Sequence, residues 1–113
     1  MNVRPLPKRW LIHEMDYYPP AEKDSWGNII ESDPIRIKHV RYDESTVFSR
    51  DSTQTKIVAD GVIFVDAKHS SPIPEFKEDT KVKINGREFT IKKIIPCYHP
   101  TKNKIRHYEL EVV

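Results

Sequence analysis

The 113 residues suffice for one domain that buries roughly two thirds of its unfolded surface, but they exclude two independent cores. Hydrophobic residues make up 37% and charged residues 32%, so the apolar side chains must be concentrated on a few elements separated by long polar loops. A net charge of +2 does not by itself argue for binding to nucleic acid or to a membrane surface.

The first eight residues contain two prolines and no apolar stretch typical of a signal peptide, so we expect an N-terminal arm at 1–8. No apolar run approaches the roughly 20 residues of a membrane helix, so we expect no membrane association and an intracellular, soluble product. The single cysteine, Cys97, excludes an internal disulfide and a Cys-rich zinc site, and it suits a reducing cytoplasm.

Residues 9–18, RWLIHEMDYY, carry apolar side chains at both odd and even positions, which predicts a strand covered on both faces. Two prolines end it, and the stretch up to Pro34 is polar apart from Trp26, Ile29 and Ile30. A turn at Gly27-Asn28 leaves two interpretations open, a long loop or a small extra hairpin.

The next strand begins at Ile35, and its alternation shifts across Lys38-His39, which indicates a β-bulge and favours a closed barrel. Residues 43–55, DESTVFSRDSTQT, predict a long exposed loop of the kind that is often functional. Val47 and Phe48 are its only apolar residues, and they either pack onto the domain or await a partner.

Residues 56–66 are apolar at both parities and predict a central strand, with a bulge or bend at Gly61. Residues 67–80 contain two prolines and predict a second long loop.

Residues 81–112 predict a three-stranded antiparallel meander whose first turn is Asn85-Gly86, the pair preferred in a type I′ hairpin. A two-residue turn sets the register, so we expect the pairs Lys81–Thr90, Val82–Phe89, Lys83–Glu88 and Ile84–Arg87. The segment 96–100 is expected to interrupt the meander. The last strand is predicted to bury Tyr108, Leu110 and Val112 and to leave His107, Glu109 and Glu111 on a solvated face.

No apolar stripe of helical period persists along the chain, so the fold class is all-β. About six strands with two long loops indicate a small barrel or a sandwich, and the predicted bulges favour a small antiparallel β-barrel comprising a single domain over 1–113.

Catalysis and metal binding are not supported. Cys97, His99 and His107 are the one grouping that suggests a nucleophile with a base, but prolines flank the first two and His107 alternates with solvated carboxylates. The same three residues lack a fourth zinc ligand and a known ligand spacing. We therefore assign no catalytic, cofactor-binding or metal-binding residues and expect no cofactor.

Nucleic-acid binding is the stronger alternative, because small barrels often place aromatic and basic residues on one face. Tyr98, Lys102, Lys104 and Arg106 form such a mixture, together with His99 and His107. The simpler interpretation, a basic turn beside structural aromatics, is favoured by the low net charge, and these residues are kept as a candidate secondary interface.

The chain resembles the minor capsid proteins of phages and prophages of Gram-positive bacteria over 47–70, VFSRDSTQTKIVADGVIFVDAKHS, and 86–113, GREFTIKKIIPCYHPTKNKIRHYELEVV. More remotely, it is similar to the head-completion or stopper proteins of long-tailed phages, which are small β-barrels that form a ring beneath the portal and adaptor.

The resemblance implies a structural, non-enzymatic virion protein, assembled in the host cytoplasm, that forms a homo-oligomeric ring in the head-to-tail connector. Its partners would be the portal or adaptor and the tail-completion proteins, with DNA only as channel content, and the isolated chain could remain monomeric. A loop of such proteins can close the channel, and we assign that part to 43–55 with Val47, Phe48, Ser49 and Arg50, and second to 67–80. A nucleic-acid-binding barrel remains the alternative.

Overall fold

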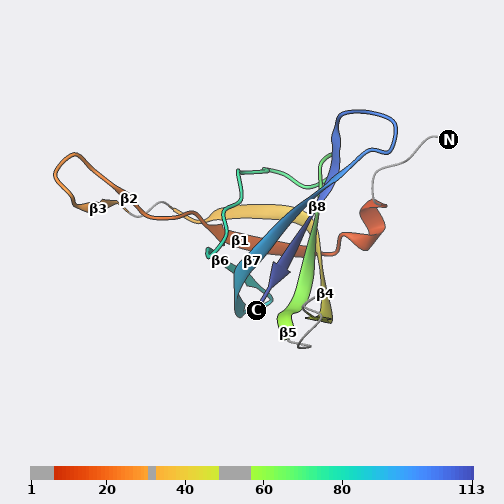
Figure 1. The fold of residues 1–113 in the computed structure, drawn as a ribbon, viewed down its shortest axis with the longest axis horizontal. Helices are drawn as coiled ribbons and strands as arrows, with labels where there is room; N and C mark the ends of the chain where they lie inside the picture. The colour runs from red at the N-terminus through yellow and green to blue at the C-terminus, as the bar shows by residue number, and fades with distance from the viewer. Residues whose placement is uncertain (1–6, 31–32, 49–56) are drawn as a thin grey trace.

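The computed structural model describes residues 7–30, 33–48 and 57–113. Six antiparallel strands close into a barrel in the order β1-β4-β5-β8-β7-β6, which confirms the predicted fold class (Figure 1). The barrel strands are β1 (His13–Tyr18), β4 (Ile35–Phe48), β5 (Ile57–Asp66), β6 (Lys81–Ile84), β7 (Arg87–Tyr98) and β8 (Ile105–Val112). A single turn of 3-10 helix, η1 (Lys8–Trp10), precedes them, and β2 (Glu22–Lys23) pairs with β3 (Ile29–Ile30) in a separate hairpin.

The first hairpin of the meander has the register that its turn predicts. Lys81 pairs with Thr90, Val82 with Phe89, Lys83 with Glu88 and Ile84 with Arg87. Asn85 and Gly86 both have positive φ, 49° and 78°, as a type I′ turn requires. The local turn chemistry and the apolar alternation therefore specify the same strand pairing.

The barrel interior is filled by the apolar positions of every barrel strand. Each of these side chains removes apolar surface from water, which stabilises the fold by about 1.5–3 kcal/mol for a fully buried Val, Leu or Ile. The fully or almost fully buried members include Met15, Tyr17, Ile37, Val40, Ile63, Val65, Val82, Ile84, Phe89, Ile91, Leu110 and Val112. The apolar supply of this polar chain is thus concentrated in one core.

The bulge predicted at Lys38-His39 is present. His13 pairs with Val40 and Met15 with Ile37, so one intervening residue of β1 faces two of β4. His39 takes a positive φ of 59° at this point. The adjacent Lys38 forms an isolated backbone bridge with Ser71, which attaches the start of the 67–80 connection to the outside of the bulge.

Two predicted segments have different bounds in the structure. The strand predicted over 9–18 begins only at His13, because residues 8–10 form η1. The loop predicted over 43–55 begins later than expected, since β4 continues to Phe48 and pairs Val47 with Ala59 and Phe48 with Ile57. A polar strand can persist here because backbone hydrogen bonds to β5 do not depend on side-chain polarity.

Of the bulge or bend predicted at Gly61, the bulge does not form on β5 itself. The register shift nearby belongs to β4. Glu44 pairs with Gly61 and Val47 pairs with Ala59, so two residues of β4 lie opposite one residue of β5. Gly61 serves a different purpose, because a Cβ at this position would overlap the ring of Tyr42. Only glycine leaves room for that ring beside β5.

The connection 67–80 forms no barrel strand, but parts of it are packed rather than exposed. Phe76 is buried, and its ring makes edge contacts with those of Tyr17 and Tyr108 at centroid distances of 5.2 and 5.9 Å. The backbone N–H of Lys77 donates to the Tyr17 hydroxyl at 3.0 Å. This connection therefore covers part of the barrel core, which lowers its suitability as a channel loop.

Candidate interaction surfaces

The β2–β3 hairpin extends away from the barrel at one end of the long axis of the molecule (Figure 1). It carries three large apolar side chains in water: Trp26 is 86% exposed, Ile29 67% and Ile30 50%. Of the two interpretations of this segment left open by the sequence, the small extra hairpin is the one that forms. We call residues 22–30 the arm.

Asp24 organises the tip of the arm. Its carboxylate accepts hydrogen bonds from the backbone N–H groups of Asn28 at 2.8 Å and Trp26 at 2.9 Å, and from the Asn28 side chain at 3.3 Å. These hydrogen bonds lower the pKa of Asp24 below its ordinary value, and the hydrogen bond from the Asn28 backbone N–H has the largest effect. The tip therefore has a defined turn that presents Trp26.

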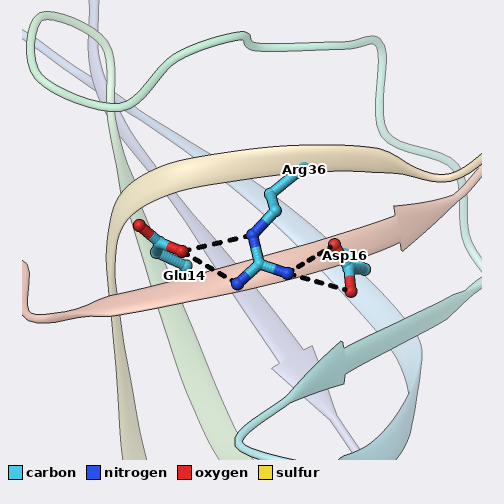
Figure 2. Close-up of polar contacts among 3 residues, drawn as sticks. All are labelled: Glu14, Asp16 and Arg36. Atoms are coloured by element: carbon cyan, nitrogen blue, oxygen red, sulfur yellow. Dashed lines mark hydrogen bonds and ion pairs between the residues drawn. The ribbon is translucent and has the colours of Figure 1, made fainter.

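Arg36 fastens the two strands between which the arm leaves the barrel. Figure 2 shows its guanidinium between Glu14 and Asp16 of β1, with Nη2 at 2.8 Å from Glu14 Oε2 and Nη1 at 3.4 Å from Asp16 Oδ1. The hydrogen bond from Arg36 lowers the pKa of Glu14. The pair Asp16–Arg36 lies one residue before Tyr17–Ile35, the last pair between β1 and β4. This exposed cluster reinforces the base of the arm.

The η1 turn lies toward the other end of the long axis (Figure 1), and a partly apolar notch lies beside it. Its volume is about 320 Å³, and it is lined by Trp10, Leu11, Arg41, Asp43 and Phe64. Arg41 pairs with Asp43 at 2.9 Å and donates to the Trp10 carbonyl at 3.2 Å. Trp10 is 48% exposed, so the notch combines an accessible indole with a polar edge.

A basic groove of about 550 Å³ adjoins the turn between β7 and β8. Of the predicted secondary interface, Lys102, Lys104 and Arg106 line it, joined by Ala67, Lys68, His99 and Ile105. Tyr98 is 57% exposed but is not among the lining residues. The turn is closed by the His99 N–H, which donates to the Lys104 carbonyl at 2.8 Å. The structure thus brings most of the predicted secondary interface together.

The predicted channel loop is only partly described. Val47 and Phe48 are the last two residues of β4, while Ser49 and Arg50 lie outside the described residues.

The arrangement of Cys97, His99 and His107 differs from the prediction. The segment 96–100 does not interrupt the meander as expected, because β7 continues to Tyr98 and places Cys97 opposite His107. His107 is buried, 8% exposed, rather than solvated, and its ring lies 6.3 Å from that of Phe64. His99 lies in the following turn. Glu109 is the third member of the cluster instead.

This cluster brings together three groups that can bind a metal ion. The ligand atoms of Cys97, His107 and Glu109 all lie within 4.8 Å of one another. Cys97 Sγ is 3.6 Å from Glu109 Oε2, and His107 Nε2 is 3.7 Å from Glu109 Oε1. Burial and the nearby Glu109 carboxylate raise the pKa of the Cys97 thiol.

Within the part of the chain that the structure describes, no helix is long and apolar enough to cross a membrane.

Comparison with known families identifies the family of the chain. A family model described as minor capsid protein matches residues 7–112. The chain belongs to the minor capsid protein family. The match spans every strand of the barrel, the arm, the notch and the basic groove. Membership makes the chain a structural component of a phage virion and not an enzyme.

Two phage proteins are similar to this chain over most of its length. The protein "Uncharacterized protein ORF5" of Lactococcus phage LL-H is 27% identical over 96 residues, which cover 82% of this chain and 81% of the relative. The protein of the same description from Lactococcus phage mv4 is 31% identical over 77 residues, covering 66% and 68%. No solved structure gives a significant match.

The sequence interpretation assigned no role to Trp26, Ile29 or Ile30. A signal was present, because a tryptophan and two isoleucines in a polar segment are as anomalous as Val47-Phe48. Their exposure became decisive only once the structure showed that the barrel core is complete without them.

Proposed function

We propose that this minor capsid protein is a ring subunit of the head-to-tail connector, which docks beneath the portal or adaptor, continues the DNA channel and receives the tail. The observation that carries the proposal is the arm. In the closed order each barrel strand has a neighbour on both sides, which leaves little strand edge for another chain to pair with, so a feature added to the barrel is the natural place for a partner contact. The arm adds such a feature at one end of the molecule.

Exposed apolar side chains on the arm are best explained by a protein partner. Tryptophan is enriched at the centres of protein interfaces, where it buries a large area at a small cost in conformational entropy. Trp26 is 86% exposed and Ile29 is 67% exposed, and neither residue belongs to the barrel core. Solubility alone would favour polar side chains at these positions.

The partner that we propose for the arm is the next copy of the same chain. The arm and η1, whose Trp10 lines the notch, lie toward opposite ends of the long axis (Figure 1), so an arm can meet the notch of a neighbour in a head-to-tail contact. Contacts between two different patches generate rings when the rotation closes. Trp26 would then pack against Trp10, Leu11 and Phe64 of the neighbour.

The proposed contact is small, which agrees with assembly of the subunits on a ring that is already in place. One buried tryptophan contributes about 150–250 Å², whereas a stable interface buries about 800 Å² per partner. The arm contact alone is too small for a stable ring of free subunits. A preceding ring that aligns the copies would supply the remainder, so the isolated chain would be monomeric in the host cytoplasm.

We assign the channel-facing part to the connection between β4 and β5, which includes Ser49 and Arg50. Because Val47 and Phe48 pair with β5, a deletion that tests this assignment must leave them in place. Replacing residues 50–55 by two glycines should abolish DNA retention in filled particles without preventing incorporation of the protein. Full retention of DNA by such particles would exclude this connection as the channel closure.

The experiment that tests the proposed function is electron microscopy of particles produced without this protein. The connector role predicts DNA-filled or emptied heads without tails, and separate free tails, with the wild-type joint restored when the protein is supplied from a plasmid. Intact tailed particles in its absence would contradict the proposal.

A second candidate function, direct DNA binding, is supported by the basic groove. Lys68, Lys102, Lys104 and Arg106 place four cationic side chains around one depression. Phosphate contacts by such residues give an affinity that falls steeply with salt. Binding of the isolated chain to oligonucleotides that weakens with salt, and that is lost in Lys102→Ala/Lys104→Ala, would support this role. Salt-independent or absent binding would oppose it.

A further inference from the structure

We propose that Cys97, His107 and Glu109 form a zinc-binding site that joins β7 to β8 beside the basic groove. The inference does not depend on the proposed connector role, because it concerns a side-chain cluster within one barrel.

The backbone places the three side chains together. Cys97 and His107 are directly opposite each other in the β7–β8 ladder. Glu109 follows His107 by two residues, so its side chain leaves the same face of β8. At the cluster β8 is also paired with β5, where Asp66 lies opposite His107, and β7 is paired with β8 as far as Tyr98. The cluster therefore rests on two constrained strands and not on a loop.

Two of the donor–donor distances are close to those of a tetrahedral zinc site. With Zn–S near 2.3 Å and Zn–O near 2.0 Å, the ligand atoms of a tetrahedral site lie about 3.5 Å apart. The sulfur of Cys97 is 3.6 Å from Glu109 Oε2, and His107 Nε2 is 3.7 Å from the other carboxylate oxygen, Oε1. The three ligand atoms lie within 4.8 Å of one another, so side-chain rotations must bring them closer together around an ion.

The two ring nitrogens of the buried His107 have different surroundings. The residue is only 8% exposed, and among the described residues its Nδ1 has no hydrogen-bond partner. The other nitrogen, Nε2, faces the cluster at 3.7 Å from Glu109 Oε1, so Nε2 is the ligand atom that the site would use, and the Glu109 carboxylate supplies negative charge beside it.

The donor set selects the metal. A thiolate, an imidazole and a carboxylate together suit Zn²⁺, whereas Ca²⁺ and Mg²⁺ prefer oxygen ligands alone. Three protein ligands leave the fourth position for water. Binding replaces the thiol proton of Cys97, which passes to solvent. The ion would hold the strands together where the register shifts between Cys97 and Tyr98, directly before the turn that carries Lys102 and Lys104.

The test uses the purified full-length chain freed of metal with a chelator and then titrated with Zn²⁺ or Co²⁺. We expect one ion per chain, a cobalt–thiolate charge-transfer band in the near ultraviolet, and a higher Tm in the presence of zinc because the ion binds only the folded state. Cys97→Ser should abolish the charge-transfer band. Glu109→Gln, at a partly exposed position that the core does not need, should weaken zinc binding about tenfold or more.

The matched control is His99→Asn, which removes the neighbouring imidazole outside the cluster and should leave zinc binding and the cobalt spectrum unchanged. His107→Asn should lose binding, and its circular dichroism reports whether the barrel remains folded; if it does not, Glu109→Gln provides the test. Absence of one-to-one binding, or a cobalt band that persists in Cys97→Ser, would overturn the proposal.

Discussion

The meander of β6, β7 and β8 and the arm use the same residue types in opposite ways. In the meander, Val82, Ile91 and Leu110 are fully buried and complete the core. In the arm, Trp26 and Ile29 project into solvent. Apolar residues in this chain therefore divide into those that hold the barrel together and those that remain available for partners. Changes in the meander should therefore reduce stability, and changes in the arm should reduce assembly alone.

The largest expected effect on stability comes from the core. Leu110→Ala removes a side chain that is 0% exposed and leaves a cavity among Ile63, Ile94 and neighbouring residues. The free energy of unfolding should fall by about 2–5 kcal/mol, as measured by urea denaturation. A loss below about 1 kcal/mol would mean that the meander is not the core that we describe.

A smaller loss should follow Gly61→Ala. The added Cβ overlaps the ring of Tyr42, so the free energy of unfolding should decrease by about 1–3 kcal/mol. In a Tyr42→Leu background the same change should cost less, because the overlapping ring atoms are absent. Equal losses in both backgrounds, measured by thermal and urea unfolding, would refute a steric origin.

Tyr17→Phe tests the attachment of the 67–80 connection to the barrel. The Lys77 N–H loses its acceptor, while the contact between the ring of residue 17 and Phe76 is kept. We expect a loss of about 0.5–1.5 kcal/mol in the free energy of unfolding. The control is Tyr18→Phe at the next, more exposed position, which should change it by less than about 0.5 kcal/mol. Identical effects of the two variants would deny the hydrogen bond a role.

The smallest effect concerns pH at the tip of the arm. The pKa of Asp24 is depressed in the folded chain, so its stabilising contribution is present above the unfolded pKa and is lost as pH falls through the folded value. The amide resonances of Trp26 and Asn28 should therefore shift together as the pH falls below the ordinary titration range of an aspartate, while those of the meander do not move with them. In Asp24→Ala this shared titration should be absent. Titration of both amides in that variant would show that another group is responsible.

The fold could be predicted where local chemistry and tertiary packing agree. Asn85-Gly86 sets both the turn and the register, and the interrupted alternation at Lys38-His39 reveals the bulge. The continuation of β4 to Phe48 could not be predicted, because its polar residues are held as a strand by pairing with β5, which is distant in sequence. The burial of His107 was also missed, since strand parity identifies a face but not what covers it.

The candidate sites were predictable to a lesser degree. Lys102, Lys104 and Arg106 are close in sequence, so their common groove follows from one turn. The grouping of Cys97 with Glu109 rather than His99 depends on the register of β7 with β8. The exposure of Trp26 depends on the arm leaving the barrel, which hydrophobicity alone would not suggest, because tryptophan in a small domain is more often buried.

The central claim, that the arm serves assembly and not folding, is tested most directly by incorporation of Trp26→Ser/Ile29→Ser into phage particles. The isolated variant should unfold within about 0.5 kcal/mol of wild type, yet it should be absent from purified particles, which should lack joined tails. Ile73→Ser, an exposed isoleucine outside the arm, should incorporate normally. Incorporation of the arm variant at the wild-type level, with tails attached, would contradict the account.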